Sequence, residues 1–179
     1  METKGKAFAL GLGLLALGGI LMAKAKPAKL TGTAKVSGGK PMAEKMVKSN
    51  AEWKKELNAQ CFFVMREGGT ESPFHNEFWD KHDDGSYVCA SCGALLFKSD
   101  SKFDSGTGWP SYFQPADPQA LHNKTDNNHG MVRTEVTCAR CGGHLGHLFD
   151  DGPPPTRQRY CINSVALKFE PKVKDEKGK

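Results

Sequence analysis

The pattern of apolar and polar residues predicts a mainly β domain that begins with one short helix. Ser49 and Glu52 have the spacing of a helix capping box, and Trp53 and Leu57 lie four residues apart on one helical face. Beyond this helix, short apolar runs alternate with turn-forming sequences such as EGGTESP, DDGS and DDGPPPT, which is typical of strands joined by loops. The predicted strands are residues 61–66, 87–89, 94–98, 131–137, 147–149 and 159–169.

The predicted strand at 131–137 alternates cleanly between apolar and charged residues. Val132 and Val136 share one face with Thr134, whereas Arg133 and Glu135 lie on the other, as in a half-buried strand. We expect the domain to span residues 49–171. Residues 172–179 have almost nothing to bury and are expected to be a disordered tail.

The N-terminal segment, residues 1–25, predicts a signal peptide or a membrane anchor. Its uncharged stretch at 7–23 would span about 25 Å as a helix, slightly less than a bilayer core of about 30 Å. Positive charge follows at once, and such charge resists translocation. We therefore expect a membrane-anchored or exported protein of the cell envelope, with a cytoplasm-facing anchor as the alternative. Residues 26–48 are expected to form a flexible basic linker.

The distribution of charge argues against a nucleic-acid partner. Residues 1–50 carry nine lysines and two glutamates, whereas residues 51–179 carry sixteen basic and eighteen acidic residues. The domain itself is therefore close to neutral and lacks the clustered positive charge that nucleic-acid binding requires.

Four of the six cysteines form two matched pairs, CASC and CARC, each followed by glycine. Two residues between thiolates let both reach one face of a tight turn, and glycine permits the positive φ that such turns favour. Two disulfides or a redox C-x-x-C are the alternatives, but the duplicated pair favours one structural Zn²⁺ with four sulfur ligands. Such an ion has no open position and is expected to hold the fold together. The expected ligands are Cys89, Cys92, Cys138 and Cys141.

Cys161, in the sequence RYCINS, has no place in such a zinc site. On a strand at 159–169, Arg159, Cys161 and Asn163 would share one face. A nearby guanidinium lowers the pKa of a thiol and favours the nucleophilic thiolate. A buried cysteine without a chemical role fits the strand equally well.

Two further motifs favour a reactive site. His144 and His147, in GGHLGHLFDDG, could donate protons or hydrogen bonds beside a thiol because imidazole titrates near neutrality. Trp109, in GTGWP, could line a small apolar pocket. For all three residues the alternative is ordinary packing.

The motifs REGGTESPF, GTGWPSYF, HLGHLFDDGPPPT and RYCINSVAL, framed by the two cysteine pairs, resemble the methionine-R-sulfoxide reductase B family. The resemblance runs from about residue 53 to residue 169. It implies two small antiparallel sheets stapled by zinc, a β-tent fold. It also implies reduction of methionine-R-sulfoxide, mainly in oxidised proteins, to methionine.

Motif positions carry the family's site residues onto this chain. The resemblance implies that Cys161 attacks the sulfoxide sulfur and becomes a sulfenic acid. The other residues it assigns are His144 and His147 beside the sulfoxide oxygen, Asn163 as a supporting amide, and Trp109 and Arg159 at the substrate.

One position departs from much of the family, where many members carry a resolving cysteine. This chain has Thr107 there, and Cys61 is the one other unpaired thiol in the sequence. The resemblance implies either a Cys61–Cys161 disulfide reduced by thioredoxin, or direct reduction of the sulfenic acid by glutathione with glutaredoxin. A monomer is expected, with membrane contact through the N-terminal segment only.

Other classes of function stay open at this stage. A related zinc-stapled fold could serve as a binding module without turnover. A zinc ribbon would bind nucleic acid in a salt-sensitive way. A zinc deaminase is disfavoured because its H-x-E sequence is absent.

Overall fold

The structure is a computed structural model that describes residues 44–173. The expected N-terminal segment at 1–25, most of the expected linker at 26–48 and most of the tail at 172–179 lie outside the described residues.

The prediction of a membrane-anchored or exported protein is corrected. Within residues 44–173, no helix has both the length and the apolar character needed to cross a bilayer. The stretch at 7–23 on which that prediction depended lies outside the described residues.

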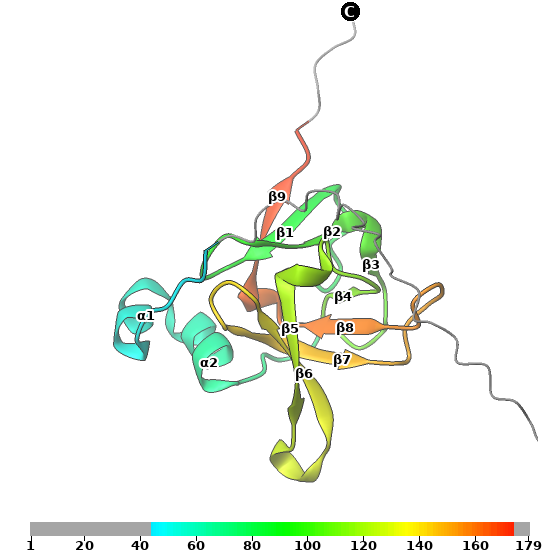
Figure 1. Ribbon diagram of the computed structural model, residues 1–179. Coiled ribbons are helices and arrows are strands. Elements are labelled where there is room, and N and C mark those ends of the chain that lie inside the picture. Colours follow the sequence, from blue (N-terminus) through cyan, green and yellow to red (C-terminus); the bar gives the residue numbers. More distant parts are fainter. Residues whose placement is uncertain (1–43, 174–179) are drawn as a thin grey trace, which may run out of the picture. The chain divides into compact units, whose positions relative to one another are not determined.

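Two antiparallel sheets form the described fold, as expected (Figure 1). The smaller sheet has the order β2-β1-β9, and the larger has the order β3-β4-β8-β7-β6-β5. The smaller sheet consists of β1 (Gly85–Cys89), β2 (Leu95–Lys98) and β9 (Leu167–Pro171). The larger consists of β3 (Lys102–Phe103), β4 (Ser111–Tyr112), β5 (Leu121–Asp126), β6 (Arg133–Cys138), β7 (His144–Phe149) and β8 (Arg159–Ile162). Short 3-10 turns are η1 (Ser99–Ser101), η2 (Pro118–Ala120), η3 (Asn128–Gly130) and η4 (Ser164–Ala166).

The predicted N-terminal helix is confirmed as α1 (Asn50–Glu56). The Ser49 side chain accepts from the Glu52 backbone N–H, and the Glu52 carboxylate accepts from the Ser49 N–H at 2.8 Å. Both halves of the capping box are therefore formed. Trp53 anchors this helix in the core.

The strand predicted at 61–66 is wrong, because these residues form part of α2 (Ala59–Glu67). The Asn58 side chain caps this helix by accepting from the Cys61 N–H at 2.8 Å, and Gly68 ends it at φ 73°. Cys61, Val64 and Met65 are buried at helical spacing, whereas Phe63, the residue before Val64, is 48% exposed. A short apolar run does not distinguish the two structures by composition alone.

The strand predicted at 159–169 is interrupted. β8 ends at Ile162, Asn163 precedes η4, and the chain then enters β9 in the other sheet. Arg159 and Cys161 share a strand face as expected, but Asn163 lies beyond the strand, so simple alternation does not determine its direction.

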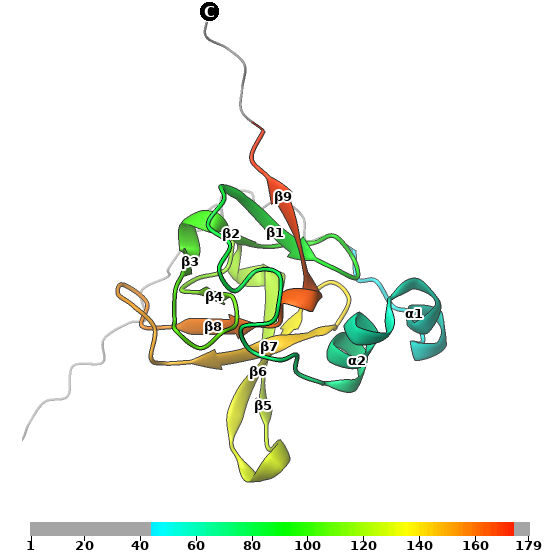
Figure 2. The same cartoon turned by 180° about the vertical axis from the view of Figure 1, so that it is seen from behind.

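An aromatic cluster joins the two sheets. The ring of Tyr87 in β1 meets that of Tyr112 in β4 edge-on at 5.2 Å, and Phe97 in β2 stacks on Tyr112 at 4.2 Å. Figure 2 shows the ribbon from behind, with α1 and α2 at the side of the β6–β7 turn and away from the β7–β8 connection. This core fixes β8 and β7, the strands that carry the candidate site.

Candidate active site and metal centre

The four paired cysteines meet at one point, as the sequence predicts. Their sulfur atoms all lie within 4.8 Å of one another. The Sγ atoms of Cys89 and Cys141 are 3.7 Å apart, and those of Cys92 and Cys138 are 3.6 Å apart. Tetrahedral Zn²⁺ with bonds of about 2.3 Å to sulfur requires separations of about 3.8 Å between sulfurs. The sulfur cluster therefore fits a tetrahedral metal ion.

The two cysteine turns are built alike but belong to different sheets. Cys89 ends β1 and Cys138 ends β6, and in each turn a glycine at φ of 71° or 69° donates its N–H to the carbonyl of the first cysteine at 2.8 Å. A metal ion held by all four sulfurs would join the small sheet to the large one. Arg66 of α2 adds a further tie, since it donates to the Cys141 carbonyl at 2.9 Å and stacks on Trp53.

Cys161 lies near the middle of the larger sheet. Its strand β8 runs between β4 and β7, where Ser111 and His147 are its direct cross-strand neighbours. The partly buried thiol lines a cavity of about 140 Å³ together with Thr70, Trp109, His147, Phe149 and Asn163.

Opposing effects act on the Cys161 thiol. Burial raises its pKa above the ordinary value, while the Arg159 guanidinium and a hydrogen bond with the Thr107 hydroxyl act to lower it. Arg159 is itself fixed by two bonds to Asp151, of 2.8 and 2.9 Å, and by the Phe149 ring 4.2 Å away. The guanidinium is therefore held beside the sulfur in one orientation.

A β-bulge brings the two histidines to the same side of β7. In regular alternation His144 and His147 would point to opposite faces. Gly146 lies opposite Val136, however, whereas His144 lies opposite the very next residue of β6, so Leu145 is an extra residue in the ladder. Leu145 is buried in the core, and the two imidazole rings meet edge-on at 5.4 Å.

Each histidine is bound by a carboxylate that sequence reasoning missed. His147 Nε2 lies 2.9 Å from Asp126 Oδ2, and His144 Nδ1 lies 2.7 Å from Glu135 Oε1. Arg133 donates to the same Asp126 oxygen at 2.8 Å. Burial lowers the pKa of His144 despite its bond to Glu135. Within the described part of the chain, the buried Nε2 of His144 has no hydrogen-bond partner.

The carboxylates themselves stay ionised. A backbone N–H from Asn128 and the contacts with His147 and Arg133 hold the pKa of Asp126 well below its usual range. Burial acts to raise the pKa of Glu135, but its bonds with His144 and Lys124 outweigh that effect and lower it. Ionised carboxylates can only accept, so each histidine must donate from the nitrogen that it shares with its carboxylate.

Comparison with known proteins identifies the family. The SelR domain matches residues 57–171. A peptide methionine sulfoxide reductase MsrB of Thiobacillus denitrificans is 56% identical over 125 residues, which are 70% of this chain and 95% of that protein. The chain belongs to the methionine-R-sulfoxide reductase B family. Proteins of the same name from Bradyrhizobium diazoefficiens and Agrobacterium fabrum are 56% and 54% identical, over 72% and 71% of this chain and 93% and 94% of their own lengths.

The structure places two more expected residues of this reductase family around one backbone segment. Trp109 donates its indole N–H to the carbonyl of Glu71 at 3.1 Å. Asn163 accepts from the Glu71 N–H at 3.0 Å and donates to the Leu145 carbonyl at 3.0 Å. Both residues line the Cys161 cavity, whereas Glu71, which binds both of them and was not expected at the site, does not.

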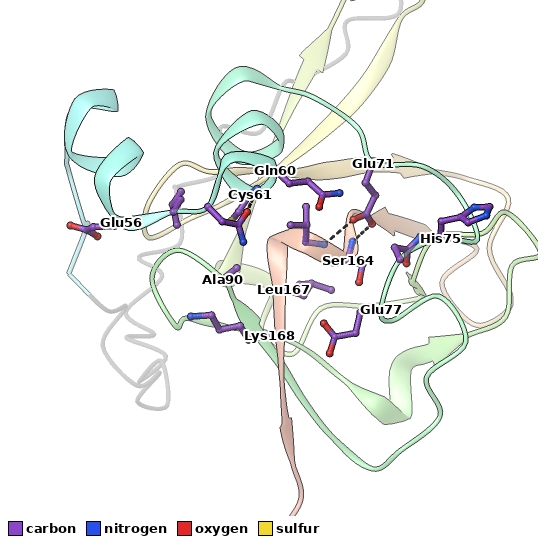
Figure 3. A pocket seen from close by; sticks show the side chains of 14 residues that line it. Glu56, Gln60, Cys61, Glu71, His75, Glu77, Ala90, Ser164, Leu167 and Lys168 are labelled. Carbon is purple, nitrogen blue, oxygen red and sulfur yellow. Dashed lines mark hydrogen bonds between the residues drawn. The ribbon is translucent and has the colours of Figure 1, made fainter.

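Cys61 is the expected site residue that the structure does not bring to Cys161. It is 4% exposed on α2, its thiol lies 3.5 Å from the sulfur of Met65, and burial raises its pKa. It lines a separate cavity of about 400 Å³ that contains neither Cys161 nor Trp109 (Figure 3).

Proposed function

We propose that this member of the reductase B family reduces methionine-R-sulfoxide in proteins, with Cys161 as its nucleophile. The enzyme is a peptide-methionine (R)-S-oxide reductase. The observation that supports the thiol mechanism is the position of Cys161: it lines a cavity together with His147, its cross-strand neighbour, and the Arg159 guanidinium lies near enough to lower the pKa of its thiol. A cysteine with no role in a reaction would need neither the charge of Arg159 nor the imidazole of His147 beside it.

In the proposed reaction, the Cys161 thiolate attacks the sulfoxide sulfur and receives its oxygen. Thiolate, sulfoxide and one proton give a sulfenic acid on Cys161 and the thioether methionine. The cysteine sulfur loses two electrons and the substrate sulfur gains them. Arg159 stabilises the thiolate before the attack, since its charge lowers the cost of the anion in a buried site.

The proton has a source in the histidine pair. Because His147 shares Nε2 with the ionised Asp126, its Nδ1 is left for the cavity, and a protonated ring can donate from that nitrogen to the sulfoxide oxygen. His144 stands edge-on to this ring with an unpartnered Nε2. We assign His147 as the proton donor and His144 as its neighbour in the same hydrogen-bonding group.

The size and lining of the cavity suit the end of a methionine side chain. A volume of about 140 Å³ holds roughly four or five small groups at about 30 Å³ each. A sulfoxide with its methyl and one methylene is a group of that size. Trp109 and Phe149 offer apolar surface to the methyl group, while Asn163 supplies a fixed amide. Only a side chain has to enter, so the rest of an oxidised protein can stay outside.

The sulfur cluster would hold one structural zinc ion. The ligands would be Cys89, Cys92, Cys138 and Cys141, whose sulfur separations fit tetrahedral coordination. An ion with four thiolates has no open position, so its contribution would be to folding, on the order of 10 kcal/mol.

We further propose that an external thiol, and not Cys61, reduces the sulfenic acid. Thr107 stands where many relatives carry a resolving cysteine, and Cys61 lines a different cavity and is buried on a capped helix. Glutathione with glutaredoxin suits a single-thiol cycle, whereas thioredoxin would serve the disulfide route.

Turnover of stereochemically pure substrates tests this function. The wild-type chain with dithiothreitol should reduce peptide methionine-R-sulfoxide and leave the S epimer unchanged. Cys161→Ser should abolish turnover, and the matched Cys61→Ser should retain it. A binding module would show no turnover in any variant. Because dithiothreitol can reduce the sulfenic acid directly, the two cycles are separated by mass spectrometry after reaction without reductant, where a Cys61–Cys161 disulfide would favour the two-thiol cycle.

A further inference from the structure

Glu71 makes four hydrogen bonds to residues around Cys161: one to Trp109 and three to the segment 163–165 that follows β8. Its backbone N–H donates to the Asn163 side chain at 3.0 Å, and its backbone carbonyl accepts from the Trp109 indole at 3.1 Å. Its carboxylate accepts from the backbone N–H of Ser164 and, at 3.0 Å, from that of Val165 (Figure 3). One residue thus contacts the wall of the Cys161 cavity and the segment that follows β8.

The carboxylate of Glu71 is buried without a cationic partner. The residue is 6% exposed, and among residues 44–173 no ion pair involves it. Burial raises its pKa and the two backbone N–H groups lower it, with burial prevailing. An unpaired buried carboxylate is costly unless its oxygens accept hydrogen bonds, so these two bonds account for its presence.

The carboxylate of Glu71 and the neighbouring residue Thr70 face different cavities. The carboxylate lines the larger cavity with Ser164 and Val165, whereas Thr70, the preceding residue, lines the cavity of Cys161. Glu71 does not touch the reacting sulfur. Its contribution to the reaction must therefore act through Trp109 and Asn163.

We propose that Glu71 is a positioning residue, which holds Trp109 and Asn163 around Cys161 and ends β8 directly after the nucleophile. The inference rests on the proposed function and extends it to a residue outside the cavity. Without the carboxylate, the Ser164 and Val165 N–H groups lose their acceptors, η4 shifts, and Asn163, the residue before it, moves with it. The backbone of residue 71 then no longer presents its carbonyl to Trp109 at bonding distance.

Glu71→Gln tests this role, with Glu77→Gln as the matched control. Glutamine keeps the shape but turns an NH₂ group toward one of the two backbone donors, so one bond is lost. Glu77 lines the same larger cavity, is exposed and makes none of these contacts. In single-turnover reactions with peptide methionine-R-sulfoxide, Glu71→Gln should lower the rate constant of sulfenic acid formation by roughly 10- to 100-fold. Glu77→Gln should leave it unchanged.

Nuclear magnetic resonance separates positioning from simple destabilisation. The chain has three tryptophans, and each indole N–H gives its own signal, with that of Trp109 assigned from Trp109→Phe. In Glu71→Gln the Trp109 signal should shift and exchange faster with solvent, while those of Trp53 and Trp79 stay in place. Equal shifts of all three signals, or an unmoved Trp109 signal with a wild-type rate, would overturn the proposal.

If Glu71→Gln does not fold, Glu71→Asp replaces it. Aspartate keeps the charge but is one methylene shorter, so it cannot reach both backbone donors, and the same changes should appear in weaker form. Unchanged Trp109 signal and rate in this variant would also contradict the role of Glu71. Failure of the proposed function would be distinct, since wild-type protein would then lack turnover while the Trp109 signal still responded to residue 71.

Discussion

Substitution of Gly146 tests whether the position of Cys161 matters, because it moves the backbone of Cys161 without changing any reactive group. Gly146 lies in β7 opposite Ile162, the residue after Cys161. A Cβ atom at this position would lie 2.0 Å from the carbonyl oxygen of Cys161, whereas real Cβ atoms essentially never approach closer than 3.0 Å. Gly146→Ala therefore changes no ionisable group but forces β7 and β8 apart beside Cys161.

The expected magnitude follows from that contact. The two backbones must separate by at least about 1 Å to relieve the overlap. A misplacement of about 1 Å can lower a catalysed rate by about 100-fold, which corresponds to about 2.7 kcal/mol. Overpacking of this kind also lowers the free energy of unfolding by about 1 to 3 kcal/mol. We expect kcat/KM for methionine-R-sulfoxide to fall by about two orders of magnitude in a protein that remains folded.

Gly85→Ala provides the matched control. Its Cβ would lie 2.4 Å from the Glu170 carbonyl oxygen, between β1 and β9 of the other sheet. The free energy of unfolding should fall by a similar amount, measured by urea titration, while kcat/KM stays at the wild-type value. If Gly146→Ala retained wild-type kcat/KM, or if Gly85→Ala lost as much activity, the argument from the position of Cys161 would fail.

Three further expectations follow from the site and the sulfur cluster. Thr107→Val should raise the pKa of Cys161, because the thiolate loses a hydrogen-bond donor, and the pH midpoint of Cys161 alkylation should rise with it. The control Thr107→Ser keeps the hydroxyl and should keep the wild-type midpoint. Chelation of zinc or Cys138→Ser should unfold the domain, since about 10 kcal/mol of metal binding is comparable to the whole stability of a domain, and retained near-ultraviolet circular dichroism after metal loss would refute the stapling role. Asp126→Asn should lower the free energy of unfolding above about pH 4, because the lowered pKa of Asp126 stabilises the folded state there, and the values for the variant and the wild type should converge as the pH falls below that value. A difference between the two proteins that stays constant down to acid pH would contradict this linkage.

The sequence alone predicted which cysteines and histidines come together better than it predicted the residues around them. Paired cysteines with glycine after each pair are a local signal, and the structure brings all four sulfurs together as expected. Alternation at 131–137 placed Arg133 and Glu135 on one face, and both reach the histidine network. The same pattern was wrong for Val132, which was expected on the buried face but lies before β6 and is 81% exposed.

The parts that failed depend on tertiary structure. The bulge at Leu145 puts His144 beside His147, yet it arises from the pairing of β7 with β6 and has no local signature. The apolar run at 61–66 predicted a strand, although the sequence also contains Asn58 and Gly68, which cap the helix α2 that forms there. The short strands β3, β4 and β5 were not predicted because they contain two to six residues with little apolar periodicity.

The partners of the candidate site residues were missed for a related reason. Asp126, Asp151 and Glu71 are polar residues in or beside turns, and Glu135 lies on the charged face of a predicted strand; charge is the ordinary composition of a surface at both kinds of position. Only the folded chain shows that they contact His147, His144, Arg159 and the segment after Cys161.

The central claim is that oxygen passes from the substrate to Cys161. The most direct measurement is intact mass spectrometry of the full chain after reaction with a heavy-oxygen-labelled methionine-R-sulfoxide peptide, without reductant, followed by fragmentation to locate the label. We predict that the mass of the chain rises by one heavy oxygen atom, located on Cys161 as its sulfenic acid, together with one equivalent of methionine peptide. Formation of the methionine peptide with no label on Cys161 and no disulfide to Cys61, or unimpaired turnover in Cys161→Ser, would contradict the account.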